Sequence, residues 1–190
     1  MARVRWASDA VRCLKRAYAR IAHSSGEVSR SRPPKTRICN AHRVQLPVVA
    51  HVPIPHGGDN ERSRPFFGYD TRTSTQHPLR HAALDVIRQV AAHRAERPVS
   101  EGEAVQNGAQ YLLTGLSLFI THEPCLMCTM ALLHSRVKGV FYLVPMPKTG
   151  GCGGIACVPS LKGVNHRFSI AVWKEDPGDW PSPLDTEIDV

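Results

Sequence analysis

The segment His122-Glu123-Pro124-Cys125-Leu126-Met127-Cys128 constrains this chain more than any other part of its sequence. Two cysteines three positions apart lie on adjacent turns of a helix, so Cys125 and Cys128 can bind one ion together. His81, in the segment His77-Pro78-Leu79-Arg80-His81, supplies a third ligand from a second helix. Three protein ligands and a water are typical of catalytic zinc, whereas a structural zinc site needs a fourth Cys or His. The spacing therefore predicts a Zn²⁺ site formed by His81, Cys125 and Cys128.

Residue 83 departs from the pattern that usually accompanies such ligands. The order H-x-E…P-C-x-x-C is the signature of zinc-dependent nucleobase deaminases, tRNA adenosine deaminases among them. Its glutamate does not touch the metal but carries protons between the attacking water, the ring and the leaving amine. In this chain that position is occupied by Ala83. The sequence thus predicts a site that holds zinc and water but contains no catalytic residue.

Basic residues are concentrated in the first 43 positions. This segment has eleven Lys and Arg against Asp9 and Glu27, a net charge of +9, whereas the rest of the chain has a net charge of −1. A basic arm on a near-neutral body is expected to contact a polyanion, the alternative being a solvated or disordered tail. The candidate RNA-binding residues are Arg12, Lys15, Arg16, Arg20, Arg30, Arg32, Lys35 and Arg37 in this segment, and Arg136, Lys138 and Arg167 beyond it.

The composition fits a soluble globular protein with one domain of ordinary size. The chain has 190 residues, of which 42% are hydrophobic and 21% charged. No apolar run reaches the roughly 18 residues of a membrane span, so no membrane association is expected. Six cysteines without a visible secretory signal indicate a reducing compartment. The Arg-, Ala- and Ser-rich start also has the composition of an organellar transit peptide, which is kept as a minority interpretation.

The hydrophobic pattern predicts strands that alternate with helices. Helices are expected over 4–22, 79–93 and 124–134, the last two with a proline in the first turn. Strands are expected over 46–52 (an edge strand bounded by prolines), 66–69, 116–121, 137–144 and 168–173. This order predicts an α/β fold in three layers, with a mixed central sheet flanked by helices and parallel strands near the metal-binding helices.

Three segments are expected along the chain. Residues 1–43 are predicted to form a basic N-terminal helix and linker, 44–173 the zinc domain, and 174–190 an acidic C-terminal tail. The helix over 124–134 is apolar on more than one side, through Leu126, Met127, Met130 and Leu133. It is therefore predicted either to pack against a partner subunit or to be fully internal.

From about Tyr69 to Trp173 the sequence resembles the cytidine deaminase-like superfamily. Within it the chain is most similar to the non-catalytic subunit of the eukaryotic tRNA wobble adenosine deaminase. The segments that carry this likeness, besides the zinc motif, are His77 to Ala83, Tyr111 to Gly115, Met130 to Tyr142, Gly151 to Gly154 and Asn165 to Phe168. A small apolar residue in place of the proton-carrying glutamate is typical of this subunit, in which valine usually stands where this chain has Ala83.

The resemblance implies a heterodimer with a catalytic deaminase subunit. The pair is expected to bind the tRNA anticodon arm and to convert A34 to I34, the wobble inosine, in nucleus and cytoplasm. This chain would then be a pseudoenzyme that supports the catalytic subunit and tRNA binding. Two alternatives remain open: an active deaminase of cytidine or deoxycytidylate type, and a zinc-stabilised interaction module.

Two carboxylates near the zinc motif are candidate substitutes for the missing glutamate. Asp85 lies one helical turn after His81 but is shorter than glutamate, and Glu123 stands where active relatives also carry glutamate. Neither is expected to restore proton transfer. The fourth zinc ligand is expected to be water, with Asp189 or the carboxylate of Val190 as alternatives.

Overall fold

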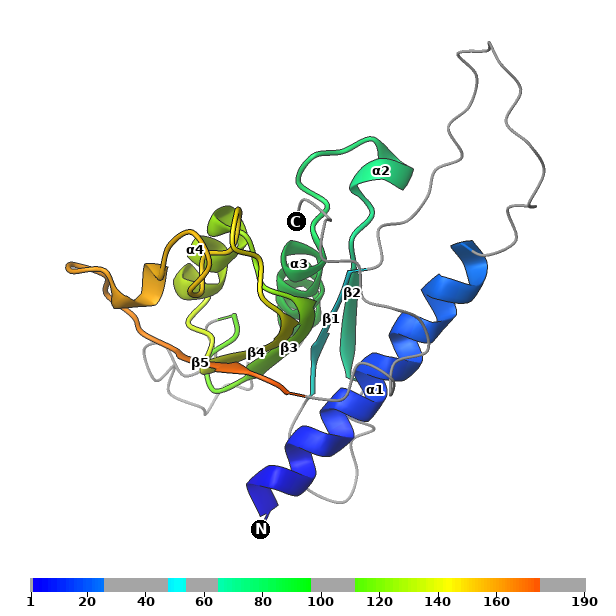
Figure 1. Cartoon of the computed structure of the whole chain (residues 1–190), viewed down its shortest axis with the longest axis horizontal. Coiled ribbons are helices and arrows are strands. Elements are labelled where there is room, and N and C mark those ends of the chain that lie inside the picture. Colours follow the sequence, from blue (N-terminus) through cyan, green and yellow to red (C-terminus); the bar gives the residue numbers. More distant parts are fainter. Residues whose placement is uncertain (1, 26–47, 54–64, 97–111, 175–190) are drawn as a thin grey trace.

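A computed structural model of the chain describes residues 2–25, 48–53, 65–96 and 112–174 (Figure 1). Its elements in chain order are α1 (Ala2–Ser25), β1 (Val49–Val52), β2 (Phe66–Tyr69), α2 (Arg72–Thr75), α3 (Ala82–Ala95), β3 (Ser117–His122), α4 (Leu126–His134), β4 (Gly139–Val144), the 3₁₀ turn η1 (Val158–Ser160) and β5 (Ser169–Val172). Among the described residues, no helix is both long and apolar enough to cross a membrane.

The five strands form one mixed sheet with the order β2-β1-β3-β4-β5. β1 pairs antiparallel with β2 and with β3, whereas β3, β4 and β5 are parallel to one another. The predicted mixed sheet, with its parallel strands near the metal-binding helices, is confirmed.

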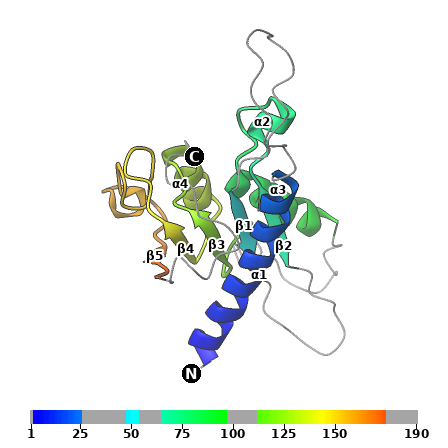
Figure 2. The same ribbon diagram turned by 45° about the vertical axis from the view of Figure 1, so that its right-hand side comes forward.

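Helices cover both faces of the sheet, which gives the three predicted layers (Figures 1 and 2). Because successive strand residues point to opposite faces, Val49 and Phe119 pack under α1, while Ala50 and Ile120 face α3 and α4. α1 contributes Leu14 and other apolar residues to its own cluster on the sheet. The side of α1 that carries Arg12, Arg16 and Arg20 is exposed.

β1 differs from its prediction as an edge strand. It lies inside the sheet, between β2 and β3, and all four of its residues are buried. Proline cannot donate to a strand ladder, but Pro53 lies just beyond the last paired residue, Val52, and does not interrupt pairing. The edges of the sheet are instead β2 and β5.

The starts of α3 and α4 lie slightly later than predicted. Pro78 lies before α3, which begins at Ala82 with His81 as its N-cap, and Pro124 lies before α4, whose N-cap is Cys125. Gly68 on β2 allows the strand to approach the start of α3 closely. A Cβ at this position would lie 2.3 Å from the carbonyl oxygen of Ala82. The sequence pattern predicts neither the short helix α2 nor the 3₁₀ turn η1.

Several predictions fall outside the described residues. They concern the linker and its Arg30, Arg32, Lys35 and Arg37, and the acidic tail with Asp189 and Val190. The predicted boundary near residue 43 lies in the same undescribed part and stays a prediction.

Candidate metal centre

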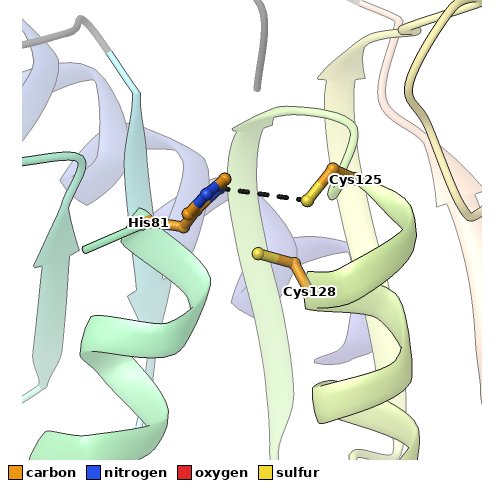
Figure 3. Close-up of side chains that lie close together, drawn as sticks. All are labelled: His81, Cys125 and Cys128. Atoms are coloured by element: carbon orange, nitrogen blue, oxygen red, sulfur yellow. Dashed lines mark hydrogen bonds between the residues drawn. The ribbon is translucent and has the colours of Figure 1, made fainter. Parts of the chain in front are cut away.

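His81, Cys125 and Cys128 point into one space between α3 and α4 (Figure 3). His81 and Cys125 are the N-caps of these two helices, and Cys128 lies in the first turn of α4. The Nδ1 atom of His81 lies 3.9 Å from the Sγ atom of Cys125, and the three ligand atoms lie within 4.8 Å of one another. Tetrahedral zinc with ordinary bond lengths would place such atoms about 3.5–3.8 Å apart. A small inward movement of the side chains is therefore enough to bind one ion.

The surroundings of these thiols favour negative charge on one of them. Both Cys125 and Cys128 lie at the start of α4, where the helix dipole stabilises anions. A hydrogen bond with Cys128, assisted by His81, lowers the pKa of Cys125 to about 4. That same hydrogen bond and burial raise the pKa of Cys128 far above its usual value.

These opposite pKa shifts mean that, with only protein atoms around the pair, Cys125 loses its proton far more readily than Cys128. A second thiolate requires a neighbouring cation, and a divalent ion would supply the compensating charge. With an imidazole nitrogen as the third donor, this set of soft ligands fits Zn²⁺.

Ala83 is fully buried and packs in the same apolar cluster as Cys125 and Cys128. No proton-carrying group stands at this position. Asp85 does not replace one, because its carboxylate is bound to the backbone N–H of Tyr69 and to the side chains of Arg88 and Gln89. The expectation that Asp85 does not substitute for the missing glutamate agrees with these contacts.

Glu123 is a structural residue, in spite of its place beside the metal motif. Its carboxylate is completely buried and accepts hydrogen bonds of 2.9 Å from the backbone N–H groups of Met146, Cys152 and Gly154. These bonds occupy both oxygen atoms. Glu123 therefore holds the loop after β4 against the end of β3, and each of its carboxylate oxygen atoms accepts at least one hydrogen bond in that contact.

The glycines of this loop make room for Glu123. A Cβ at Gly150 would lie 2.2 Å from the carboxyl carbon of Glu123, and one at Gly151 would lie 2.5 Å from the hydroxyl of Thr129. Sequence reasoning interprets the run Gly150-Gly151 only as a turn. The available signal for this buried contact is an acidic residue directly after one predicted strand, together with a glycine-rich run after the next predicted strand.

Sequence reasoning also missed a buried ion pair beside the centre. Asp70 is fully buried at the end of β2, and both its oxygen atoms lie 3.0 Å from the Nε atom of Arg72. Thr71 lies between Asp70 and Arg72 in the sequence, and its backbone N–H donates to the carbonyl oxygen of Arg80 at 2.9 Å. The pair thereby anchors the segment that precedes His81.

The predicted RNA-binding residues occupy two parts of the surface. Arg12, Arg16 and Arg20 share one exposed face of α1, with Lys15 half-buried beside it. Arg136 and Lys138 are exposed near the start of β4. Arg167 donates to the carbonyl oxygens of Pro159 and Leu161, at 2.9 and 3.2 Å, so it also has a structural role.

Comparison with known proteins agrees with this fold. Residues 58–144 match the cytidine and deoxycytidylate deaminase zinc-binding region. This part of the chain, a little under half of its length, is therefore similar to a zinc-binding region of deaminases. Curated relatives in two yeasts are named as subunits of tRNA-specific adenosine deaminases, which confirms the resemblance stated from the sequence.

Two curated relatives show how far the similarity extends along the chain. The chain is 32% identical over 99 residues to the tRNA-specific adenosine deaminase subunit tad3 of Schizosaccharomyces pombe, a match that covers 52% of this chain and 31% of that protein. It is 43% identical over 68 residues to the probable inactive tRNA-specific adenosine deaminase-like protein 3 of Homo sapiens, covering 36% of this chain and 19% of that protein. The matches thus span about a third or less of these relatives.

A solved structure shows the same fold. It comes from a study of A-to-I editing by tRNA A34 deaminases and has a TM-score of 0.53, with 18% identity, over 84% of this chain and 94% of that chain. At this identity the likeness establishes the fold alone, and it confirms the predicted cytidine deaminase-like architecture.

Proposed function

We propose that this chain is the non-catalytic, zinc-binding subunit of a heterodimeric tRNA adenosine deaminase that makes inosine at the wobble position. The observation that carries the proposal is the buried cluster of His81, Cys125 and Cys128 with Ala83 in place of a proton carrier. Relatives named as tRNA adenosine deaminase subunits, and one named as probably inactive, support it.

His81, Cys125 and Cys128 would hold the zinc ion, which when bound would supply an acidified water. General acid–base catalysis contributes about 10²–10⁴-fold to the rate of such reactions. Because Ala83 cannot move protons, and Asp85 and Glu123 are engaged elsewhere, the chain alone would not release ammonia at a useful rate. The role left to the centre is to join α3 to α4 across the apolar core.

The exposed side of α4 supports a partner subunit. Cys128 and Leu132 face the core, whereas Leu126 and Met130 are 44% and 58% exposed on the other side of the helix. The alternative of a fully internal helix disagrees with this exposure. Apolar side chains clustered on one helix face are typical of protein–protein interfaces. We assign this face to the catalytic subunit.

The arginines of α1 support a contact with tRNA. The apolar side of the helix packs on the sheet, so Arg12, Arg16 and Arg20 project from the opposite side at successive turns. A row of positive charges along one helix can contact several phosphates of one polyanion. Phosphate contacts of this kind release counterions and make binding sensitive to salt.

Co-expression with the catalytic subunit of the same organism tests the proposal. Inosine in tRNA should be formed by the purified pair and by neither subunit alone, and the pair should bind tRNA more weakly as salt rises. Turnover of cytidine or deoxycytidylate by this chain alone would instead identify an active deaminase. A stable zinc protein without affinity for either the subunit or tRNA would identify an interaction module.

We propose that the protein works in nucleus and cytoplasm, where tRNA is made and used. Fluorescent tagging at either end, with fractionation of the organelles, tests this placement. Import into an organelle would support the transit-peptide interpretation of the N-terminal segment instead.

A further inference from the structure

Cys152 and Cys157 face each other across a short hairpin in the loop after β4. Two backbone hydrogen bonds flank the pair, from the N–H of Gly153 to the carbonyl oxygen of Ala156 (3.0 Å) and from the N–H of Val158 to the carbonyl oxygen of Gly151 (2.9 Å). This pattern defines a non-hydrogen-bonded antiparallel pair, in which the Cα atoms lie about 4.5 Å apart and both side chains leave the same face. A disulfide requires Cα atoms about 4.4–6.8 Å apart, so the backbone already satisfies its main condition.

The two thiols have no part in the metal centre. Among the described residues, the one group of side chains placed to bind a metal consists of His81, Cys125 and Cys128. Cys152 is buried with its Sγ atom 3.6 Å from the hydroxyl of Thr129, and Cys157 is half-buried. The pair is therefore available for chemistry of its own.

A bond between these cysteines would fix the loop that holds Glu123. The N–H groups of Cys152 and Gly154 both donate to the Glu123 carboxylate. Glu123 lies two residues before Cys125, at the end of β3. Closing the hairpin covalently would thus stabilise the contact between the loop and the strand that leads to the metal ligands.

We propose that Cys152 and Cys157 form a reversible intramolecular disulfide by exchange with a low-molecular-weight disulfide such as oxidised glutathione. The more exposed Cys157 attacks the reagent, forms a mixed disulfide and releases one thiol. The sulfur of Cys152 then displaces the second thiol. The two cysteines lose two electrons and their two thiol protons, and the reagent is reduced to two thiols. Intracellular disulfides of this kind are usually transient and redox-sensing.

The order of attack follows from the surroundings of each thiol. Burial raises the pKa of Cys152 to about 12, so this thiol stays protonated in the reduced protein. Cys157 is more accessible to a reagent in solution. Once the mixed disulfide has formed, Cys152 is its nearest thiol across the hairpin.

Peptide mapping of the full-length, zinc-loaded chain tests the proposal. The protein is equilibrated with graded ratios of oxidised and reduced glutathione, alkylated and digested with trypsin. Cleavage after Lys148 and Lys162 isolates residues 149–162, which contain Cys152 and Cys157 and no other cysteine. At oxidising ratios this peptide should lose the mass of two hydrogen atoms and resist alkylation, and reductant should reverse both changes.

Thermal unfolding and metal content provide independent readouts. Closing this short loop should raise the Tm of the oxidised protein by about 5 °C, with no loss of zinc. Cys157→Ser should abolish the shift, whereas the matched Cys13→Ser should keep it. Full alkylation of the peptide at every ratio, a glutathione adduct that never resolves, or a bond to another cysteine would overturn the proposal. Comparing oxidised with reduced wild-type protein keeps the test decisive if a variant does not fold.

Discussion

A single buried carboxylate, Glu123, connects the end of β3 to the loop after β4. Replacement with glutamine keeps the shape but leaves one acceptor oxygen for three backbone N–H donors, and it directs an amide N–H toward them. We expect Glu123→Gln to lower the free energy of unfolding by about 2–4 kcal/mol. Urea denaturation measures this loss, and the exposed Glu96→Gln serves as the control. Equal stability of the two variants would contradict the structural role of Glu123.

His51 is a second buried residue whose protonation bears on stability. It stacks on Phe67, with ring centroids 4.4 Å apart, and burial, opposed in part by a hydrogen bond with the carbonyl of Phe66, lowers its pKa to about 4. Below pH 6.5 the unfolded chain gains a proton at this position that the folded chain does not bind. Stability contributed by neutral His51 is thus complete above pH 6.5 and is lost as the pH falls to about 4, by about 3 kcal/mol.

The substitution His51→Phe isolates this contribution. Phenylalanine keeps the stacking on Phe67 but does not titrate, so the difference in unfolding free energy between variant and wild type should change in favour of the variant between pH 6.5 and 4. Parallel curves for wild type and His51→Phe would rule out a neutral buried imidazole.

At the scale of elements, α4 has one apolar side that is buried and one that is exposed. Its inner side packs in the core and carries Cys128, and its outer side exposes Leu126, Met127 and Met130. We expect Met130→Asp to weaken binding of the catalytic subunit at least about tenfold, because a charge would be buried at the interface, with little change in the stability of the free chain. Titration calorimetry measures the affinity. Val172→Asp, an exposed apolar position on β5, is the control and should bind normally.

α1 likewise has a buried apolar side and an exposed, positively charged side. Leu14 and Tyr18 are buried on the sheet, and Arg12, Arg16 and Arg20 are exposed. The triple change of these arginines to alanine should weaken tRNA binding by the heterodimer. It should also reduce the slope of log K against log salt by about 0.7–0.9 for each phosphate that these arginines neutralise. Arg88→Ala, which removes an arginine paired with Asp85, should leave the slope unchanged. An unaltered slope in the triple variant would refute phosphate binding by α1.

At the scale of the whole molecule, the candidate metal centre joins α3 to α4 at their N-termini. A bound ion would stabilise only the folded chain, since the unfolded chain has no preformed site. We expect the purified protein to contain one zinc per chain and a strong chelator to lower its Tm by several degrees. The variant Cys125→Ser with Cys128→Ser should contain no zinc and should not respond to the chelator. If the Tm of the wild-type protein did not change when zinc is removed, the proposed centre would be contradicted.

The sequence determined those features that depend on near neighbours along the chain. The cysteine pair follows the helical repeat, the strands follow alternation and apolar runs, and Ala83 is visible two residues after His81. For this reason the mixed sheet, the helices α1, α3 and α4, and the gathering of His81, Cys125 and Cys128 were predicted, to within a few residues at the helix ends.

Only the tertiary structure decided features that rest on contacts between distant segments. β1 became an interior strand because β2 and β3 pair with both its sides. Glu123 became a buried structural carboxylate because N–H groups more than twenty residues away converge on it. Cys152 and Cys157 became partners because a hairpin sets their register. No local pattern encodes such pairings, since their energies arise only when the chain has folded.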